Sequence, residues 1–522
     1  MLDDAVTPAL AVGGAALLWL LLRPDPRLRS VQALPCPAST LPVLGNTLDL
    51  ASYHLEHLHD WILEQCLLHE GRPWRLQALG SPPLIVVSTP DLFEDVLKTQ
   101  FEIFDKGPRM NMIFESAMGD GIFAVDGDKW KQQRKALSHL FTMRKFRDTI
   151  AHAIEKHLQV FAQVLDKAVT DQDAGRTALF EMSSAFHRYA FDTFTEIAFG
   201  LDEDTLGRMG TDGEDALFLT ACTDVTKHLE MRFHQPDFVW QLKGKLNVGT
   251  ERLLKEAIDI VDKKVYAVVH KTIERSQKGE ASQGQDVLSM MMEHMHEFKD
   301  EHATDPQRLG KFLRDVGFSM IAAGKDSTGT TLTWVLIMIA RMPHVLTEIR
   351  QELRSVLPAL FTDRSFVPSM DEVENGLPYL EAVVRETLRL CPLAPLNAKE
   401  ANHDTTLCDG TFVPRGSRVY IPAYALARMP SVWGADAADF KPQRWLDGGK
   451  LRSFSSFQFN AFHAGPRICL GMRFALVQLK TTLAYLLSKY DFELEKDPHA
   501  YKYEMAITFA LHGDLRARVT RL

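Results

Sequence analysis

One cysteine near the C-terminus stands in a context that could hold a reactive thiolate. An apolar run over residues 474–487 follows Cys469 and predicts a helix, so the sulfur would lie near a helix N-terminus, where the dipole and free N–H groups favour the thiolate. Glycines nearby let the backbone run close to a flat group, and Arg467 offers a forked donor to a carboxylate. The pattern F-x-x-G-x-R-x-C-x-G is formed by Phe462, Gly465, Arg467, Cys469 and Gly471. This arrangement is suited to holding a thiolate against the iron of a haem.

The loop resembles the haem-binding loop of the cytochromes P450. The resemblance implies that Cys469 is the metal ligand of haem b and that Arg467 binds a haem propionate. It also implies a cytochrome P450-like fold, mainly α with small β-sheets, and monooxygenase activity. The electrons would come from NADPH through a flavoprotein reductase, so NADPH would not be bound directly.

A second motif is the pair Trp130 and Arg134, which lie four apart on one face of a predicted helix. In the family, such a W-x-x-x-R pair meets a haem propionate through the indole N–H and the guanidinium. Seven basic residues and no acidic one lie between Lys129 and Arg147. This run is either a solvated helix face or a docking surface for an acidic reductase.

A third motif joins Glu386 and Arg389, three apart on a predicted helix, with Arg444 in the later segment 440–445. That segment resembles the family's F-x-P-E-R-[FW] pattern, with glutamine in place of glutamate. The resemblance implies a buried network in which the Glu386 carboxylate accepts hydrogen bonds from both arginines. Its role would be structural, namely to fix the chain ahead of the cysteine loop.

The fourth motif lies inside a long predicted helix and contains Gly324, Asp326, Ser327 and Thr328. A glycine within a helix costs about 1 kcal/mol relative to alanine, and the resemblance implies a groove over the iron as its reason. Dioxygen cleavage needs protons, which an acid and a hydroxyl deliver through water. Asp326 fills the acid position, and Ser327 stands where the family usually has threonine. Serine keeps the donor but lacks the methyl group that restrains the rotamer.

The elements expected to position these motifs are mostly helices. Apolar periodicity predicts helices at roughly 130–166, 178–200, 214–230, 249–276, 307–341, 343–356, 371–390 and 472–488. Segments 74–79 and 83–88 predict a hairpin, 418–422 a further strand, and 505–511 with 515–519 a last hairpin. We expect one large catalytic domain over residues 51–522, because no linker interrupts this range.

The overall composition narrows the class of protein. The 522 residues are 46% hydrophobic and 24% charged, which is typical of a globular protein. A formal net charge of −9 argues against binding of nucleic acid. Six scattered cysteines without a C-x-x-C pair are too sparse for a disulfide scaffold and favour a reducing compartment.

The N-terminus predicts a membrane anchor over residues 1–30, with a helix at about 5–22. Asp3 and Asp4 precede the apolar run and three arginines follow it, which is the wrong order for a cleaved secretory signal. The positive flank should stay in the cytosol. We expect a single-pass protein of the endoplasmic reticulum membrane, in contact with membrane lipid, whose catalytic domain faces the cytosol behind a proline-rich hinge at 31–50.

The substrate is predicted from four stretches that resemble the fatty-acid ω-hydroxylase branch of the family, at 104–108, 119–128, 409–416 and 425–434. The segments expected to line the pocket (110–123, 218–222, 320–323, 394–396 and 507–509) are almost wholly apolar, which suits a long alkyl chain. A substrate carboxylate would want a cation, for which Arg109, Lys227 and Arg232 are candidates. The prediction is hydroxylation of the terminal carbon of a long-chain fatty acid.

Several alternatives stay open on the sequence alone. The same apolar pocket could take a sterol, terpenoid or aromatic substrate. A peroxide-using haem enzyme is disfavoured, since such branches tend to lose the acid–alcohol pair that Asp326 and Ser327 retain. From other classes, the chain could be a haem-binding membrane protein without turnover, or a helical scaffold without haem.

Overall fold

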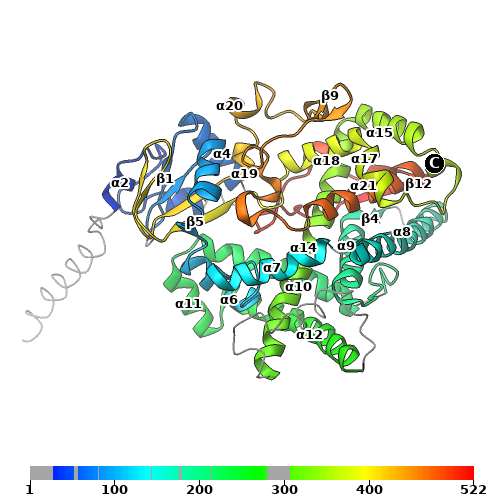
Figure 1. Ribbon diagram of the computed structural model, residues 1–522, viewed down its shortest axis with the longest axis horizontal. Coiled ribbons are helices and arrows are strands. Elements are labelled where there is room, and N and C mark those ends of the chain that lie inside the picture. The colour runs from blue at the N-terminus through cyan, green and yellow to red at the C-terminus, as the bar shows by residue number, and fades with distance from the viewer. Residues whose placement is uncertain are drawn as a thin grey trace, which may run out of the picture.

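The computed structural model describes residues 28–51, 57–79, 81–142, 144–175, 179–211, 213–278 and 306–522. These ranges are mainly α-helical, with a β-rich part on the left of Figure 1 and the C-terminus on the right. The long helices are α4 (Leu58–Leu68), α6 (Pro108–Met118), α7 (Gly127–Thr142), α8 (Arg144–Asp173), α9 (Met182–Phe199), α10 (Gly213–Phe233), α11 (Asp237–Leu246), α12 (Gly249–Gln277), α14 (Pro306–Arg341), α15 (Pro343–Val356), α18 (Pro378–Leu390) and α21 (Met472–Lys489). Shorter helices include α2 (Arg29–Gln32), α3 (Thr47–Ala51), α5 (Pro90–Glu94), α16 (Ala359–Thr362), α17 (Met370–Gly376), α19 (Ala423–Leu426) and α20 (Pro430–Trp433). Single turns of π- or 3-10 helix are η2 (Asp95–Thr99), η5 (Pro442–Trp445), η6 (Asn460–Phe462), η7 (Gly465–Arg467) and η8 (Pro498–Ala500).

Helix α14 lies at the centre, where α9, α12, α18 and α21 pack against it. Nearly all of its side chains between Phe312 and Ile339 are buried. A helix that is largely apolar on every side is stable only when other elements cover it, so this segment organises the packing of its neighbours.

A five-stranded sheet joins two distant parts of the chain, visible in Figure 1 as blue and yellow strands lying together. Its order is β1 (Trp74–Leu76), β2 (Leu84–Val86), β8 (Arg418–Ile421), β5 (Asn397–Ala401) and β3 (Phe104–Asp105). Strands β1 and β2 pair antiparallel with Trp74 opposite Val86, which confirms the predicted hairpin. Strand β8 lies parallel to β2 and antiparallel to β5.

Each face of this sheet packs on a different part of the protein, because successive side chains of a strand point to opposite faces. On one face, Ile85, Val419 and Ile421 share a core with α5 and η2. On the other face, Leu84 and Tyr420 share a core with α4. The sheet therefore separates the α4 side of the molecule from the η2 side.

The smaller sheets correct one prediction. Residues 505–511 form no strand, and β12 (Arg516–Arg521) pairs instead with β11 (Tyr490–Leu494), with β4 (Phe180–Glu181) on its other side. Strand β11 follows α21 directly and offers β12 a five-residue partner. The two-stranded sheets are β6 (Thr405–Thr406) with β7 (Phe412–Val413), and β9 (Leu446–Asp447) with β10 (Lys450–Leu451).

One predicted helix is divided in the structure. The range 371–390 contains α17 and α18, because Pro378 lacks the N–H that a continuous helix would need and instead begins α18. The range 130–166 falls on α7 and α8, on either side of residue 143, which lies outside the described residues. Apolar periodicity did not indicate α4, α6 or α11.

The predicted hinge at 31–50 lies against the sheet over its described length. Val31 is buried, the Arg75 N–H donates to the Pro35 carbonyl, and Gly45 bridges to Ala78. The predicted anchor helix at about 5–22 lies outside the described residues. Within the described ranges no single helix is long and apolar enough to span a membrane, and one pair, α14 with α15, meets that criterion only with a bend of 110° between the helices.

Candidate active site

The cysteine loop is closed by short-range contacts ahead of α21. The Cys469 N–H donates to the Phe462 carbonyl at 2.9 Å, and α21 begins three residues after the cysteine with Gly471 as its N-cap. Burial raises the pKa of the Cys469 thiol, while the Gly471 N–H and the Arg134 guanidinium act to lower it. Cys469 is nevertheless solvent-accessible. A side chain that is surrounded by protein and yet accessible to solvent is expected to face an internal space.

The two loop glycines have different surroundings. Gly465 has a φ of +64°, and a Cβ there would lie 2.1 Å from the Leu97 carbonyl oxygen of η2. This glycine is therefore required by contact with the protein backbone, which corrects the expectation that both glycines serve a flat cofactor. At Gly471 the nearest atom to an added Cβ is the Cys469 sulfur at 4.0 Å, so no described protein atom excludes a side chain.

Arg467 projects from this loop toward the segment before α7. Its guanidinium donates to Asp126 at 2.5 Å and to the Val125 carbonyl, and it lies 4.4 Å from the centre of the Trp130 ring. Its Nε is buried and has no hydrogen-bond partner in the described part of the chain. Arg134 interacts electrostatically with Cys469. The structure thus brings Trp130, Arg134 and Arg467 to one side of the cysteine loop.

Two lysines outside the four sequence motifs join this group. Lys399 of β5 is 3% exposed, and its ammonium has no hydrogen-bond partner among the described residues. Burial and the nearby Arg467 lower the pKa of Lys399 to about 7. Burial, Arg467 and Lys399 likewise hold the pKa of Lys106 well below its usual value. No sequence signal marked Lys399, because the polar strand Asn397–Ala401 lacks apolar alternation.

Among the described residues, this group contains more cations than carboxylates. Asp126 and Asp105 are the carboxylates that act on Lys399. His463 stays neutral at neutral pH, since burial and Lys399 lower its pKa to about 3. Buried cations with lowered pKa values and a buried donor without a partner form a site that fits an anionic group.

The middle of α14 carries a small accessible stripe in an otherwise buried helix. Ala322, Ala323 and Ser327 are partly exposed, while their neighbours along the helix are buried. Ala323 and Ser327 are four apart and so share a face, and the Ser327 hydroxyl donates to the Ala323 carbonyl at 2.5 Å. A hydroxyl thus lies on the partly exposed stripe in the otherwise buried middle of α14.

Gly324 and Thr328 lie on other faces of the helix. A Cβ at Gly324 would lie 2.1 Å from the Phe194 ring of α9, so helix packing accounts for this glycine, in place of the expected groove. Thr328 is buried and its hydroxyl donates to the Gln478 side chain of α21 at 3.4 Å. The structure therefore separates Gly324 and Thr328 from Ser327.

Asp326 is paired with its neighbour in the sequence. The Lys325 ammonium lies 2.5 Å from the Asp326 carboxylate, and both side chains are buried. Burial lowers the pKa of Lys325 and the Asp326 carboxylate raises it, and the net shift is upward. His187 of α9 lies nearby, and desolvation together with the Lys325 charge lowers its pKa to about 4. The acid on α14 thus has a charged partner that the motif alone did not indicate.

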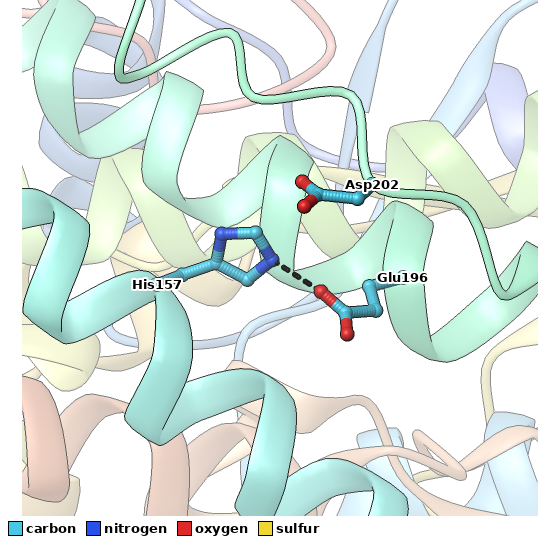
Figure 2. Close-up of side chains that lie close together, drawn as sticks. All are labelled: His157, Glu196 and Asp202. Carbon is cyan, nitrogen blue, oxygen red and sulfur yellow. Dashed lines mark hydrogen bonds and ion pairs between the residues drawn. The ribbon is translucent and has the colours of Figure 1, made fainter.

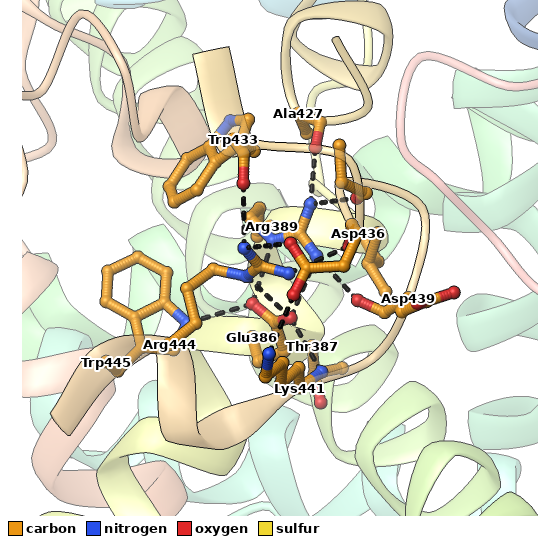
Figure 3. Close-up of polar contacts among 12 residues, drawn as sticks. Glu386, Thr387, Arg389, Ala427, Trp433, Asp436, Asp439, Lys441, Arg444 and Trp445 are labelled. Carbon is orange, nitrogen blue, oxygen red and sulfur yellow. Dashed lines mark hydrogen bonds and ion pairs between the residues drawn. The ribbon is translucent and has the colours of Figure 1, made fainter. Parts of the chain in front are cut away.

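The predicted network around Glu386 is present and more extensive than expected (Figure 3). Arg389 donates two hydrogen bonds of 2.8 Å to the carboxylate, and Arg444 approaches it at 3.3 Å. The Trp445 indole and the Lys441 N–H also donate to Glu386, at 2.9 and 2.8 Å. The arginines donate in addition to backbone carbonyls of the segment 427–439. Because Glu386 and Arg389 are fully buried, the network fixes this segment against α18.

Comparisons with known proteins agree with this geometry. The Cytochrome P450 family model matches residues 35–513. The chain belongs to the cytochrome P450 family. Among similar proteins, Cytochrome P450 CYP94D109 of Paris polyphylla is 34% identical over 84% of this chain and 85% of its own length. Cytochrome P450 86B1 of Arabidopsis thaliana is 31% identical over 93% of this chain and 86% of its own length. Alkane hydroxylase MAH1 of Arabidopsis thaliana is 27% identical, covering 90% of each chain.

The cofactor of this cytochrome P450 is haem b, and its electrons come from NADPH through a reductase. The residues present fit the haem, because an accessible cysteine adjoins a group of cations that outnumber the carboxylates near them in the described structure, and the buried Lys399 ammonium has no hydrogen-bond partner there. Cys469 would hold the iron, and Lys399, Arg467 and Arg134 would face the propionates. When bound, the haem supplies dioxygen activation, which a thiolate ligand favours.

A second cluster of possible ligands lies near the middle of α8, and we do not assign a metal ion to it. His157, Glu196 and Asp202 approach one another, and His157 contacts Glu196 at 2.8 Å (Figure 2). The Lys156 ammonium already lies 2.8 Å from Glu196 and 2.7 Å from Asp202. Because this ammonium already bridges the two carboxylates, we read the cluster as a link between α8, α9 and the following loop.

The basic run on α7 and α8 is partly neutralised. Lys129 pairs with Asp120, Lys131 with Glu102, and Arg147 with Asp371 and Glu374. These pairs are well exposed. The run is therefore less positive than its sequence indicates, and its use as a docking surface stays a prediction.

Proposed function

We propose that this cytochrome P450 hydroxylates the terminal carbon of long-chain fatty acids. The observation that carries the proposal is that the accessible stripe of α14 lies on a helix of the main apolar core. This core also includes residues of α6, α10 and the C-terminal loop, among them Met118, Phe218, Cys222, Met320 and Phe509. An apolar enclosure of this kind suits an alkyl chain.

The relatives give further support. One of the similar proteins is named an alkane hydroxylase, so a chain of this length and family can act on a saturated hydrocarbon. Terminal attack requires that the chain end approach the reacting centre in a fixed orientation. The small side chains of Ala322 and Ala323 beside Ser327 leave room for such an approach.

We also propose that the protein acts at the endoplasmic reticulum membrane, with its catalytic domain in the cytosol. The apolar N-terminal run and the arginines after it support this location. A fatty acid could then enter from the lipid in which it is dissolved.

The test is product analysis with the purified holoenzyme, a eukaryotic reductase, NADPH and a series of saturated and unsaturated fatty acids. We expect terminal hydroxy acids that form only with NADPH. If fatty acids stay unoxidised by an enzyme whose reduced carbon-monoxide complex is normal, the fatty-acid proposal is wrong. A sterol or terpenoid would then be the class to examine.

A further inference from the structure

A narrow pocket on the α4 face of the five-stranded sheet is lined in part by an arginine that has no hydrogen-bond or ion-pair partner among the described residues. The pocket lies between β1, β2 and β8 of the sheet, α4, and the end of α10. Its walls are mostly apolar, with Leu58, Ile62, Leu76, Leu84 and Phe233 among them. Arg418 and Tyr420 of β8 bring polar groups into this lining.

Arg418 is held in place by the sheet. It is 9% exposed, and it stands opposite Leu84 of β2 and Glu400 of β5. Arg418 and Tyr420 are two residues apart on one strand and so point to the same face. Their proximity is also electrostatic, because the arginine lowers the pKa of the Tyr420 phenol against the upward effect of burial.

The guanidinium of Arg418 forms no hydrogen bond or ion pair with any residue in the described ranges. The small exposed part of Arg418, 9% of the residue, leaves its charge available to an anionic ligand. Glu400 faces it across the strand pair but forms no ion pair with it, and burial raises the pKa of that carboxyl. The Tyr420 hydroxyl also has no hydrogen-bond partner in the described part of the chain.

The other charged groups nearby are already paired. Arg109 donates to Asp237 at 2.9 Å, and His234 contacts Glu230 at 2.8 Å. Two further cations that the sequence suggested for a carboxylate are also occupied. Arg232 forms a buried two-point pair with Glu251, and Lys227 pairs with Glu504.

We infer that Arg418, together with the Tyr420 hydroxyl, binds the carboxylate of the fatty-acid substrate, while the apolar walls of the pocket cover the first methylene groups. The inference rests on the proposed function and adds the residue that recognises the acid. A carboxylate can accept two parallel hydrogen bonds from a guanidinium and a third from a phenol. The walls would keep water from these bonds.

The test compares an acid with its neutral ester. Dissociation constants of dodecanoic acid and methyl dodecanoate are measured with the holoenzyme from the change in haem absorption on binding. We expect Arg418→Gln to weaken binding of the acid about 10- to 100-fold and to leave the ester nearly unchanged, as loss of a charged hydrogen-bond pair predicts. Arg418→Lys should keep part of the preference for the acid. Tyr420→Phe should lose a smaller part.

Arg415→Gln is the matched control, because Arg415 lies three residues earlier, on the surface of the same segment. It should bind both ligands as the wild type does. If Arg418→Gln weakens acid and ester equally, Arg418 supports the sheet and the inference is wrong, although fatty-acid hydroxylation can still hold. If the wild type binds the ester or a neutral terpenoid but no acid, the inference and the proposed function fail together.

Discussion

At the scale of single residues, the partly exposed stripe of α14 distinguishes Ser327 from its neighbours Asp326 and Thr328, which are buried. The Ser327 hydroxyl donates to the Ala323 carbonyl and lies on the accessible face, whereas Thr328 is buried against Gln478. The sequence shows both hydroxyls side by side, but only the packing of α14 on α21 distinguishes them. Asp326 beside them is paired with Lys325, so proton transfer through this acid would require the pair to loosen.

We expect Ser327→Ala to raise the amount of hydrogen peroxide formed per NADPH consumed, because it removes the hydroxyl that we propose for proton delivery. The matched control is Thr328→Val, which removes a hydroxyl of similar size from the buried face. It should leave peroxide formation unchanged. Equal peroxide from both variants would show that Ser327 has no special part in proton delivery, and Ser327→Thr should restore or improve coupling.

Cys469 provides a spectroscopic prediction. Cys469→Ser should abolish the thiolate signature of the reduced carbon-monoxide complex, because a serine hydroxyl cannot supply the sulfur ligand. Circular dichroism should show a retained helical fold, because serine is close to cysteine in size. A thiolate signature in this variant would contradict the assignment of the ligand.

The lowered pKa of Lys399 predicts that the affinity for haem depends on pH. Its pKa is lowered to about 7 in the protein without an anion, and a bound propionate would raise that pKa again. Below pH 7 the lysine is charged in both states, so its titration does not affect haem affinity. Above pH 7 it must take up a proton when haem binds, so haem affinity should fall as the pH rises.

The measurement is haem binding to the apoprotein between about pH 6 and about pH 9. In Lys399→Met the affinity should be lower and its slope against pH shallower. Lys106, whose pKa is also lowered, would account for a remaining slope. An unchanged slope in Lys399→Met would contradict the placement of Lys399 beside a propionate.

At the scale of elements, the sequence predicted helices best where periodicity is long. The ranges of α12, α14, α15 and α21 agree with prediction to within a residue or two at each end. The sequence did not show why individual glycines are required. Gly324 meets Phe194 of α9, and Gly465 meets the Leu97 carbonyl of η2. Both contacts join segments far apart in the sequence, so no local pattern reports them.

The link between α18 and the segment 427–445 gives a prediction about stability. Glu386→Gln would leave two buried arginines without their carboxylate, and we expect a loss of about 3–5 kcal/mol in the free energy of unfolding. The control is Glu256→Gln on α12, whose partner Arg252 is also at helical spacing but exposed. It should cost at most about 1 kcal/mol. Urea unfolding followed by tryptophan fluorescence measures both, and similar losses would contradict a special role of the buried network.

At the scale of the whole molecule, the site is assembled from parts that only the fold brings together. The cysteine loop, α7 and β5 contribute the cations, and α14 contributes the accessible hydroxyl. The four sequence motifs gave Cys469, Arg467, Trp130 and Arg134, since each belongs to a recognisable pattern. They could not give Lys399 or Arg418, because these lie on strands whose pairing depends on the distant hairpin of β1 and β2. The two faces of one sheet thus contribute to cofactor binding and to the proposed substrate recognition.

The most direct test of the account uses a saturated fatty acid whose terminal methyl group carries three deuterium atoms. The holoenzyme is incubated with reductase and NADPH, and mass spectrometry counts the deuterium left in the monohydroxylated acid. The account predicts that the main product retains two deuterium atoms and is absent with Cys469→Ala. A main product that retains all three would show attack within the chain and would contradict terminal hydroxylation.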